Sequence, residues 1–108
     1  MSKYHNRKTV VNGIKFDSAK EAARYQELML LLHAGEIDDL RLQVRYRLHE
    51  PYTEPDGKKN GAIDYVADFT YLRDGQRIVE DVKGVRTSVY LLKRRMLKEK
   101  YGIDIVEV

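Results

Sequence analysis

The chain has 108 residues, of which 43% are hydrophobic and 34% are charged, as in a folded protein with a modest core rather than a disordered chain. Its 20 lysines and arginines against 17 acids give a net charge of +3, which permits a polyanionic partner without requiring one. The lack of cysteine excludes disulfides and thiolate metal sites, and without a long apolar run or a signal-peptide pattern we expect one cytoplasmic domain over residues 1–108 and no membrane partner.

A hairpin and a helix are expected first. Asn12-Gly13 lies between two short apolar runs, a pattern typical of a β-hairpin, here over residues 9–16. A helix should begin at Ser18, whose side chain can cap it together with Glu21, and should run to about residue 34, because the next residue is a glycine.

Three strands are expected in the middle of the chain. Alternating apolar and polar residues over 41–50 indicate a strand with one wet face. Residues 62–72 and 77–83 are rich in β-branched and aromatic side chains, and Asp74-Gly75 between them predicts a hairpin. Residues 51–61 hold both prolines, two glycines and several charges, which indicates a mobile loop.

A second helix and a last strand close the chain. Thr87 or Ser88 can cap a helix that runs to about residue 100 and ends at Gly102. Residues 103–108 then read as a short strand. The expected order of hairpin, helix, three strands, helix and strand defines an α/β (α+β) fold with a mixed sheet.

One acid of the first helix lies on the apolar side of that helix. At about 100° per residue, Glu21 falls within roughly 40° of Tyr25 and Leu28. One interpretation is that Glu21 only completes the capping box, its carboxylate reaching back to the Ser18 backbone amide. The other is that it faces the core for a chemical reason.

Two further acids interrupt predicted strands. Asp68 lies in the middle of its strand, and Asp81 shares a strand face with Lys83 in the next one. Both could simply lie on the wet face of an edge hairpin. Together with Glu21, however, they can meet at one point, where carboxylates bind Mg²⁺ and a lysine can orient a water and stabilise charge on a phosphate.

The ordered set of Glu21, Asp68 and Asp81-Val82-Lys83 resembles the PD-(D/E)xK nuclease superfamily. More closely, FDSAKEAARYQEL, GEIDDLRLQ, YVADFTY, VEDVKG and YGIDIVEV are similar to segments of a family of small phage-type endonucleases assigned to that superfamily. The likeness covers nearly the whole chain and implies a restriction-endonuclease-like core. Ala67 replaces the proline that gives the superfamily its name, a departure that is common there.

The resemblance also implies roles for single residues. Glu21, Asp68 and Asp81 would hold one or two Mg²⁺ ions, for which Mn²⁺ can substitute, and the Val82 carbonyl would complete the metal shell. Lys83 would assist the attacking water. Gln43 matches a recurring glutamine and is a candidate neighbour of the site. Glu80 lies on the opposite strand face, so Asp81 is the better match to the motif acid.

Basic and polar residues outside this set are candidates for contact with DNA. The first eight residues form either a flexible basic arm that follows a phosphate backbone or a frayed end. In the second helix, a buried stripe of Val89, Leu92 and Met96 would leave Lys93 at its edge, able to reach the site. The candidate DNA-binding residues are Lys3, Arg7, Lys8, Arg86, Thr87 and Lys93.

Together with these residues, the resemblance implies a Mg²⁺-dependent DNA endonuclease. The similarity to archaeal Holliday-junction resolvases, together with the small size of the chain, favours a homodimer that cuts branched DNA in phage-type recombination or processing, in the host cytoplasm if phage-encoded. Two alternatives stay open. One is a nicking or linear-duplex nuclease, and the other is a noncatalytic DNA-binding accessory protein that retains the fold.

Overall fold

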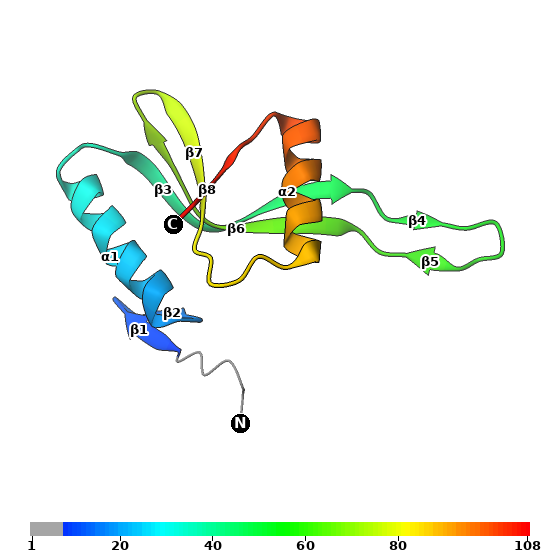
Figure 1. Cartoon of the computed structure of the whole chain (residues 1–108), viewed down its shortest axis with the longest axis horizontal. Helices are drawn as coiled ribbons and strands as arrows, with labels where there is room; N and C mark the ends of the chain where they lie inside the picture. Colours follow the sequence, from blue (N-terminus) through cyan, green and yellow to red (C-terminus); the bar gives the residue numbers. More distant parts are fainter. Residues whose placement is uncertain (1–7) are drawn as a thin grey trace.

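The computed structural model describes residues 8–108 and is built on a four-stranded sheet (Figure 1). Its strands lie in the order β3 (Asp38–His49), β6 (Ile63–Arg73), β7 (Gln76–Asp81) and β8 (Ile105–Glu107). The first three pair antiparallel and β8 pairs parallel to β7, so the sheet is mixed. With its two helices, the chain confirms the predicted α/β (α+β) class and order of elements.

The N-terminal hairpin forms as its turn residues predict. Strands β1 (Thr9–Val11) and β2 (Ile14–Phe16) pair antiparallel. Asn12 and Gly13 both adopt positive φ angles, 52° and 77°, which is the backbone that a tight two-residue hairpin turn requires. This small hairpin packs against the following helix rather than joining the main sheet.

Helix α1 (Ala19–His33) begins and ends where its sequence predicts. The Ser18 side chain accepts a hydrogen bond from the Glu21 backbone N–H at 3.1 Å, which caps the helix. At the other end the chain leaves the helix through Gly35, at a φ of 76°.

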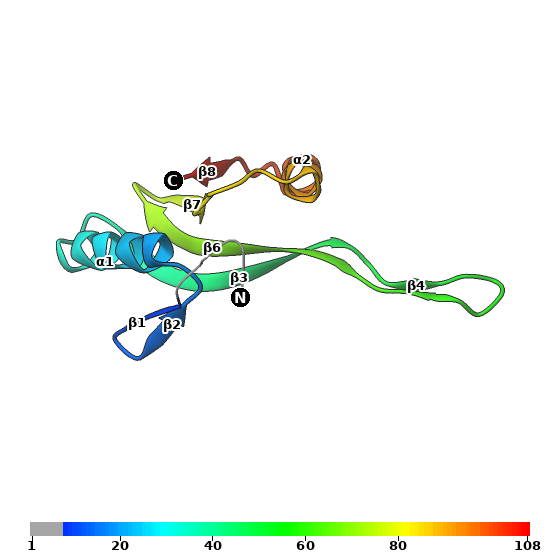
Figure 2. The same ribbon diagram turned by 60° about the horizontal axis from the view of Figure 1, so that its bottom comes forward.

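The segment predicted as a loop over residues 51–61 contains a short hairpin. Strands β4 (Tyr52–Thr53) and β5 (Lys59–Asn60) pair antiparallel and extend the β3–β6 ribbon away from the body of the molecule (Figures 1 and 2). Proline and glycine here shape the turn rather than prevent pairing. The mobility of this segment stays a prediction.

The strand predicted over 77–83 ends earlier than expected. β7 stops at Asp81, so Lys83 lies in the connection that leads to helix α2 (Ser88–Tyr101). The Thr87 side chain caps α2 by accepting from the Tyr90 backbone N–H at 3.1 Å, and Gly102 ends it at a φ of 71°. The last strand, β8, is shorter than the predicted 103–108.

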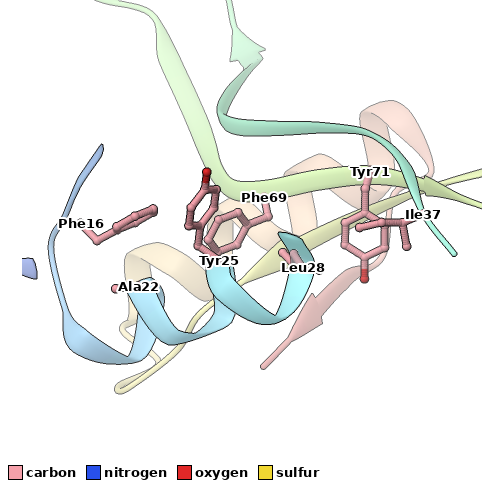
Figure 3. Close-up of a cluster of buried hydrophobic side chains, with 7 residues drawn as sticks. All are labelled: Phe16, Ala22, Tyr25, Leu28, Ile37, Phe69 and Tyr71. Carbon is pink, nitrogen blue, oxygen red and sulfur yellow. The ribbon is translucent and has the colours of Figure 1, made fainter. Parts of the chain in front are cut away.

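Strand β6 contributes to two separate hydrophobic clusters. Its residues Phe69 and Tyr71 pack with α1 and the N-terminal hairpin in a cluster completed by Phe16, Ala22, Tyr25, Leu28 and Ile37 (Figure 3). Its residues Tyr65 and Ala67 pack in a second cluster with Leu48, Val79, Tyr90 and Leu97. The two helices are therefore held at different ends of one strand. Along that strand, Asp68 lies between the residues of the two clusters.

The predicted buried stripe of α2 is wrong at Val89 and Leu92, while Met96 is partly buried against the second cluster. Val89 and Leu92 are 60% and 58% exposed, whereas Tyr90 and Leu97 are buried. Tyr90 and Leu97 are seven residues apart and so share a face. That face packs in the second cluster, and the Tyr90 hydroxyl donates a hydrogen bond to Glu107 of β8 at 2.7 Å. Helix periodicity cannot indicate these contacts with distant residues. Among the described residues, no helix is long and apolar enough to span a membrane.

Candidate active site

Most of the predicted site residues line one cleft of about 820 Å³, and Gln43 is outside this lining. The start of α1 and the ends of β6 and β7 meet there with the loop that leads into α2. Of the residues singled out in the sequence, the cleft is lined by Glu21, Asp68, Asp81, Val82, Lys83, Thr87 and Lys93. Residues more than 60 positions apart are thus brought together, as a composite site requires.

Glu21 is buried, as its position on the apolar stripe predicts, with 6% of its surface exposed. Its carboxylate accepts from the Asp17 backbone N–H at 3.3 Å, and not from Ser18 as a simple capping box would have it. The other carboxylate oxygen accepts from the Gln43 side-chain amide at 3.1 Å. Glu21 therefore both supports the helix start and contacts a site residue from another element.

Gln43 links two of the acids. Its amide nitrogen lies 3.1 Å from Glu21 Oε1 and 3.4 Å from Asp68 Oδ1, so the same amide group faces both carboxylates. The backbone of Gln43 has a φ of 53°, which a side-chain-bearing residue rarely adopts inside a strand. A strained backbone at a residue that contacts two inward acids is typical of a functional position.

Asp68 joins β6 to the end of β7. Its second oxygen accepts from the Val82 backbone N–H at 2.8 Å, just past the last paired residue of β7. Burial raises the pKa of Asp68 and the nearby Glu21 carboxyl adds to that rise, while the Val82 N–H opposes it. The structure therefore keeps a carboxylate where desolvation disfavours its charge.

Asp81 is 5% exposed and has two partners. The Tyr65 hydroxyl donates to its Oδ2 at 2.6 Å, and Lys83 Nζ lies 3.2 Å from its Oδ1. Burial raises the pKa of Asp81 to about 6, helped by the neighbouring Asp68 and opposed by Tyr65 and Lys83. Burial disfavours the ionised forms of these two close carboxyl groups, and a bound cation would stabilise both of them.

Lys83 is held from three sides although it lies outside the strand. Besides its ion pair with Asp81, its ammonium lies 3.8 Å from the centre of the Tyr90 ring, within the range of a cation–π contact. Its backbone carbonyl accepts from Lys20 Nζ at 2.8 Å. The ammonium is therefore directed into the cleft beside Asp81.

The sequence did not indicate Tyr65, Tyr90 or Lys20 as site residues. Tyr65 and Tyr90 are both buried in the structure. A buried tyrosine hydroxyl needs a polar partner, and that need was the only available signal. Their partners, Asp81 and Glu107, lie 16 and 17 residues away in the sequence.

Glu80 belongs to a different arrangement, as its strand face predicts. It is fully buried at 0% exposure and forms an ion pair with Arg24 of α1 at 2.6 Å. The Tyr71 hydroxyl donates to the same carboxylate in a very short hydrogen bond. Glu80 therefore fastens α1 to the sheet and leaves Asp81 as the acid of this strand in the cleft.

The predicted DNA-binding residues lie in different places. Thr87 and Lys93 line the cleft. Arg86 pairs with Glu107 at 2.8 Å and is not among the lining residues, while Lys8 is exposed near the N-terminal hairpin. Lys3 and Arg7 lie outside the residues that the structure describes.

The donor atoms in the cleft suit a hard divalent cation. Within residues 8–108, no cluster of three or more His, Cys, Asp or Glu side chains has the geometry of a ready metal site. Asp68 lies close to Asp81 and also close to Glu21, which is held by Gln43. Mg²⁺ commonly binds through one or two carboxylates plus water and substrate phosphate. The pair therefore fits such an ion, with Glu21 as an outer partner.

Fold and site together define a small mixed α/β domain with a cleft that holds two close carboxylates and a lysine. The chain belongs to the family described as "Protein of unknown function (DUF1064)", whose model matches residues 1–105. No curated protein and no solved structure matches the chain.

Proposed function

We propose that this protein is a Mg²⁺-dependent DNA endonuclease, and that Asp68, Asp81 and Lys83 form its active site. One observation carries the proposal: the half-buried carboxylate of Asp68 and the buried carboxylate of Asp81, on adjacent strands, meet a lysine in an open cleft, where burial raises the pKa of Asp81 to about 6. A hairpin with a merely solvated face would have no reason to bury these acids. The resemblance to the PD-(D/E)xK superfamily supports the same assignment.

In this proposal Asp68 and Asp81 hold the metal, with the Val82 carbonyl as a further ligand. When bound, the metal supplies charge that activates a water and neutralises the phosphate. The Tyr65 hydrogen bond fixes one oxygen of Asp81, so the other faces Lys83. Gln43 holds Glu21 beside Asp68.

Lys83 then acts directly on the reaction. Its ammonium, directed by Asp81 and the Tyr90 ring, can orient the attacking water and stabilise the charge that develops on the phosphate oxygens. Water adds to phosphorus and one ester P–O bond breaks. The products are a phosphate monoester and an alcohol, with the water proton passing to the leaving oxygen.

Branched DNA is the substrate we propose, cut by a homodimer in phage-type recombination or processing, in the cytoplasm. The support for this choice is the resemblance to archaeal Holliday-junction resolvases, which act as dimers on junctions. A nicking or linear-duplex activity is the rival within the same chemistry. A noncatalytic DNA-binding protein would retain the cleft without turnover.

The experiment compares a labelled four-way junction with a linear duplex of the same sequence, in Mg²⁺. Asp81→Asn and Lys83→Met test the site, and Asp104→Asn and Lys100→Met, outside the cleft, are matched controls. We expect the junction to be cut by the wild type and by both controls, and by neither site variant. Equal cutting of both DNAs would replace the resolvase assignment by a general nuclease. Binding without cutting would support the noncatalytic alternative.

A further inference from the structure

The arginines that the structure describes are all engaged in ion pairs. Every arginine among residues 8–108 lies within 4.0 Å of a carboxylate of the same chain. Arg45 and Arg47, for example, share Asp64, and Arg86 and Arg94 share Glu107. The positive charges of these side chains are therefore paired with negative charges of the same chain.

Two lysines of the cleft differ from this pattern. Lys20 and Lys93 line the cleft and have no carboxylate partner in the described part of the chain. Lys20 belongs to the first turn of α1, where its amine donates to the Lys83 carbonyl, and Lys93 belongs to α2. The cleft thus has an unneutralised cation on each of the two helices that border it, with the acids of β6 and β7 also in its lining.

The same cleft also has an apolar rim, formed by three exposed valines. Val66, Val85 and Val89 line it and are 36%, 70% and 60% exposed. Covering apolar side chains that are exposed to water in a cleft lowers the free energy, so it favours binding of a ligand there. A ligand for this site should therefore carry both anionic groups and apolar faces.

We infer that the cleft binds an unpaired strand of nucleic acid. Lys20 and Lys93 contact backbone phosphates, and the three valines contact the sugars or the faces of unstacked bases. A duplex keeps its base faces stacked inside and presents mainly phosphates at this depth, whereas a single strand offers both surfaces. This inference rests on the proposed function, because it names the part of a DNA substrate that enters the active site.

The test measures binding by fluorescence anisotropy in EDTA, so that cleavage plays no part. The probes are a labelled oligothymidine and a duplex of the same length, each titrated with protein at several salt concentrations. Lys20→Gln/Lys93→Gln tests the phosphate contacts and Val85→Ser/Val89→Ser tests the rim. Lys15→Gln/Lys100→Gln removes the same charge from exposed positions outside the cleft. Circular dichroism confirms that each variant is folded.

We expect the wild type to bind the single strand more tightly than the duplex. The double lysine variant should weaken single-strand binding about 20-fold at 0.1 M salt and lower the salt-dependence slope by about 1.4, since each phosphate contact on a single strand contributes about 0.7. The valine variant should weaken single-strand binding about fivefold, with little change for the duplex. The control pair should keep both affinities within about twofold of the wild type.

The inference is overturned if duplex and single strand bind equally and the cleft variants behave like the control pair. It is also overturned if the valine variant converts a dimer to a monomer in sedimentation without changing strand binding, because the rim would then contact a second copy of the chain. These outcomes are independent of catalysis. Single-strand binding without cleavage in Mg²⁺ would remove the nuclease proposal and leave the strand-binding cleft in place.

Discussion

The Tyr65 hydroxyl donates a hydrogen bond to Asp81 Oδ2 at 2.6 Å, joining the middle of the sheet to the acid at the end of β7. This contact stabilises the ionised carboxyl group and opposes the burial that raises the pKa of Asp81 from 3.8 to about 6. Because the folded pKa lies above the ordinary value, ionisation of Asp81 reduces the stability of the native state as the pH rises from about 4 to about 6.

Tyr65→Phe should therefore destabilise the protein in a pH-dependent way. Loss of the hydroxyl leaves the Asp81 charge less satisfied, with a cost of about 1–3 kcal/mol at pH 7.5 and a smaller cost at pH 4, where the carboxyl is protonated. Urea denaturation at both pH values measures the difference. Tyr46→Phe, a half-buried tyrosine outside the cleft lining, is the control. An equal loss at both pH values would show that the hydrogen bond does not support the ionised acid.

Gln43 allows backbone strain to be separated from side-chain contact. Gln43→Ala and Gln43→Gly both remove the amide that faces Glu21 and Asp68. Only glycine adopts the φ of 53° without strain, so Gln43→Gly should be more stable than Gln43→Ala by about 1 kcal/mol. Thermal denaturation compares the two. If alanine is the more stable of the pair, the left-handed backbone at this position is not the source of strain.

The buried pair of Arg24 and Glu80 should dominate the stability of the contact between α1 and the sheet. Arg24→Ala leaves a fully buried carboxylate without its ion-pair partner and should cost about 3–5 kcal/mol. Glu27→Ala removes the exposed partner of the same arginine and should cost less than about 1 kcal/mol. Denaturant titration measures both. Comparable losses in the two variants would mean that the buried pair contributes no more than a surface contact.

Glu107 gives the protein a second pH dependence, of opposite sign. Hydrogen bonds from Tyr90 and Arg86 lower the pKa of Glu107 from 4.5 to about 2. A lowered pKa contributes stability above pH 4.5 that is lost as the pH falls toward 2. Glu107→Gln should therefore be less stable than the wild type at pH 6 and equal to it near pH 2, as followed by circular dichroism. Glu99→Gln, an exposed acid of α2, should show no such convergence.

Much of the fold follows from local chemistry. Asn12-Gly13 specifies its hairpin, and the caps at Ser18 and Thr87 place both helix starts, because each depends on a few neighbouring residues. Strand alternation also separated Asp81, which lines the cleft, from Glu80, which pairs with Arg24 on the other side. The helix stripe likewise showed that Glu21 points inward.

The remaining features depend on partners distant in the sequence. Periodicity indicated one face of α2, whereas Tyr90 and Leu97 of a neighbouring face pack against the sheet, and Tyr90 also contacts Glu107. The ion pair of Arg24 with Glu80 spans 56 residues. Residues 51–61 pair as β4 and β5 because the neighbouring strands β3 and β6 carry them side by side, which composition alone does not reveal.

The most direct test of the metal-dependent site is Mn²⁺ binding followed by electron paramagnetic resonance. We predict that the wild type binds Mn²⁺ and that Asp68→Asn and Asp81→Asn each weaken this binding at least about tenfold, because each removes one of the two carboxylates assigned to the metal. Asp104→Asn, outside the cleft, should bind as the wild type does. Wild-type affinity in both cleft variants, or no Mn²⁺ binding by the wild type, would contradict the assignment of this cleft as a metal-dependent active site.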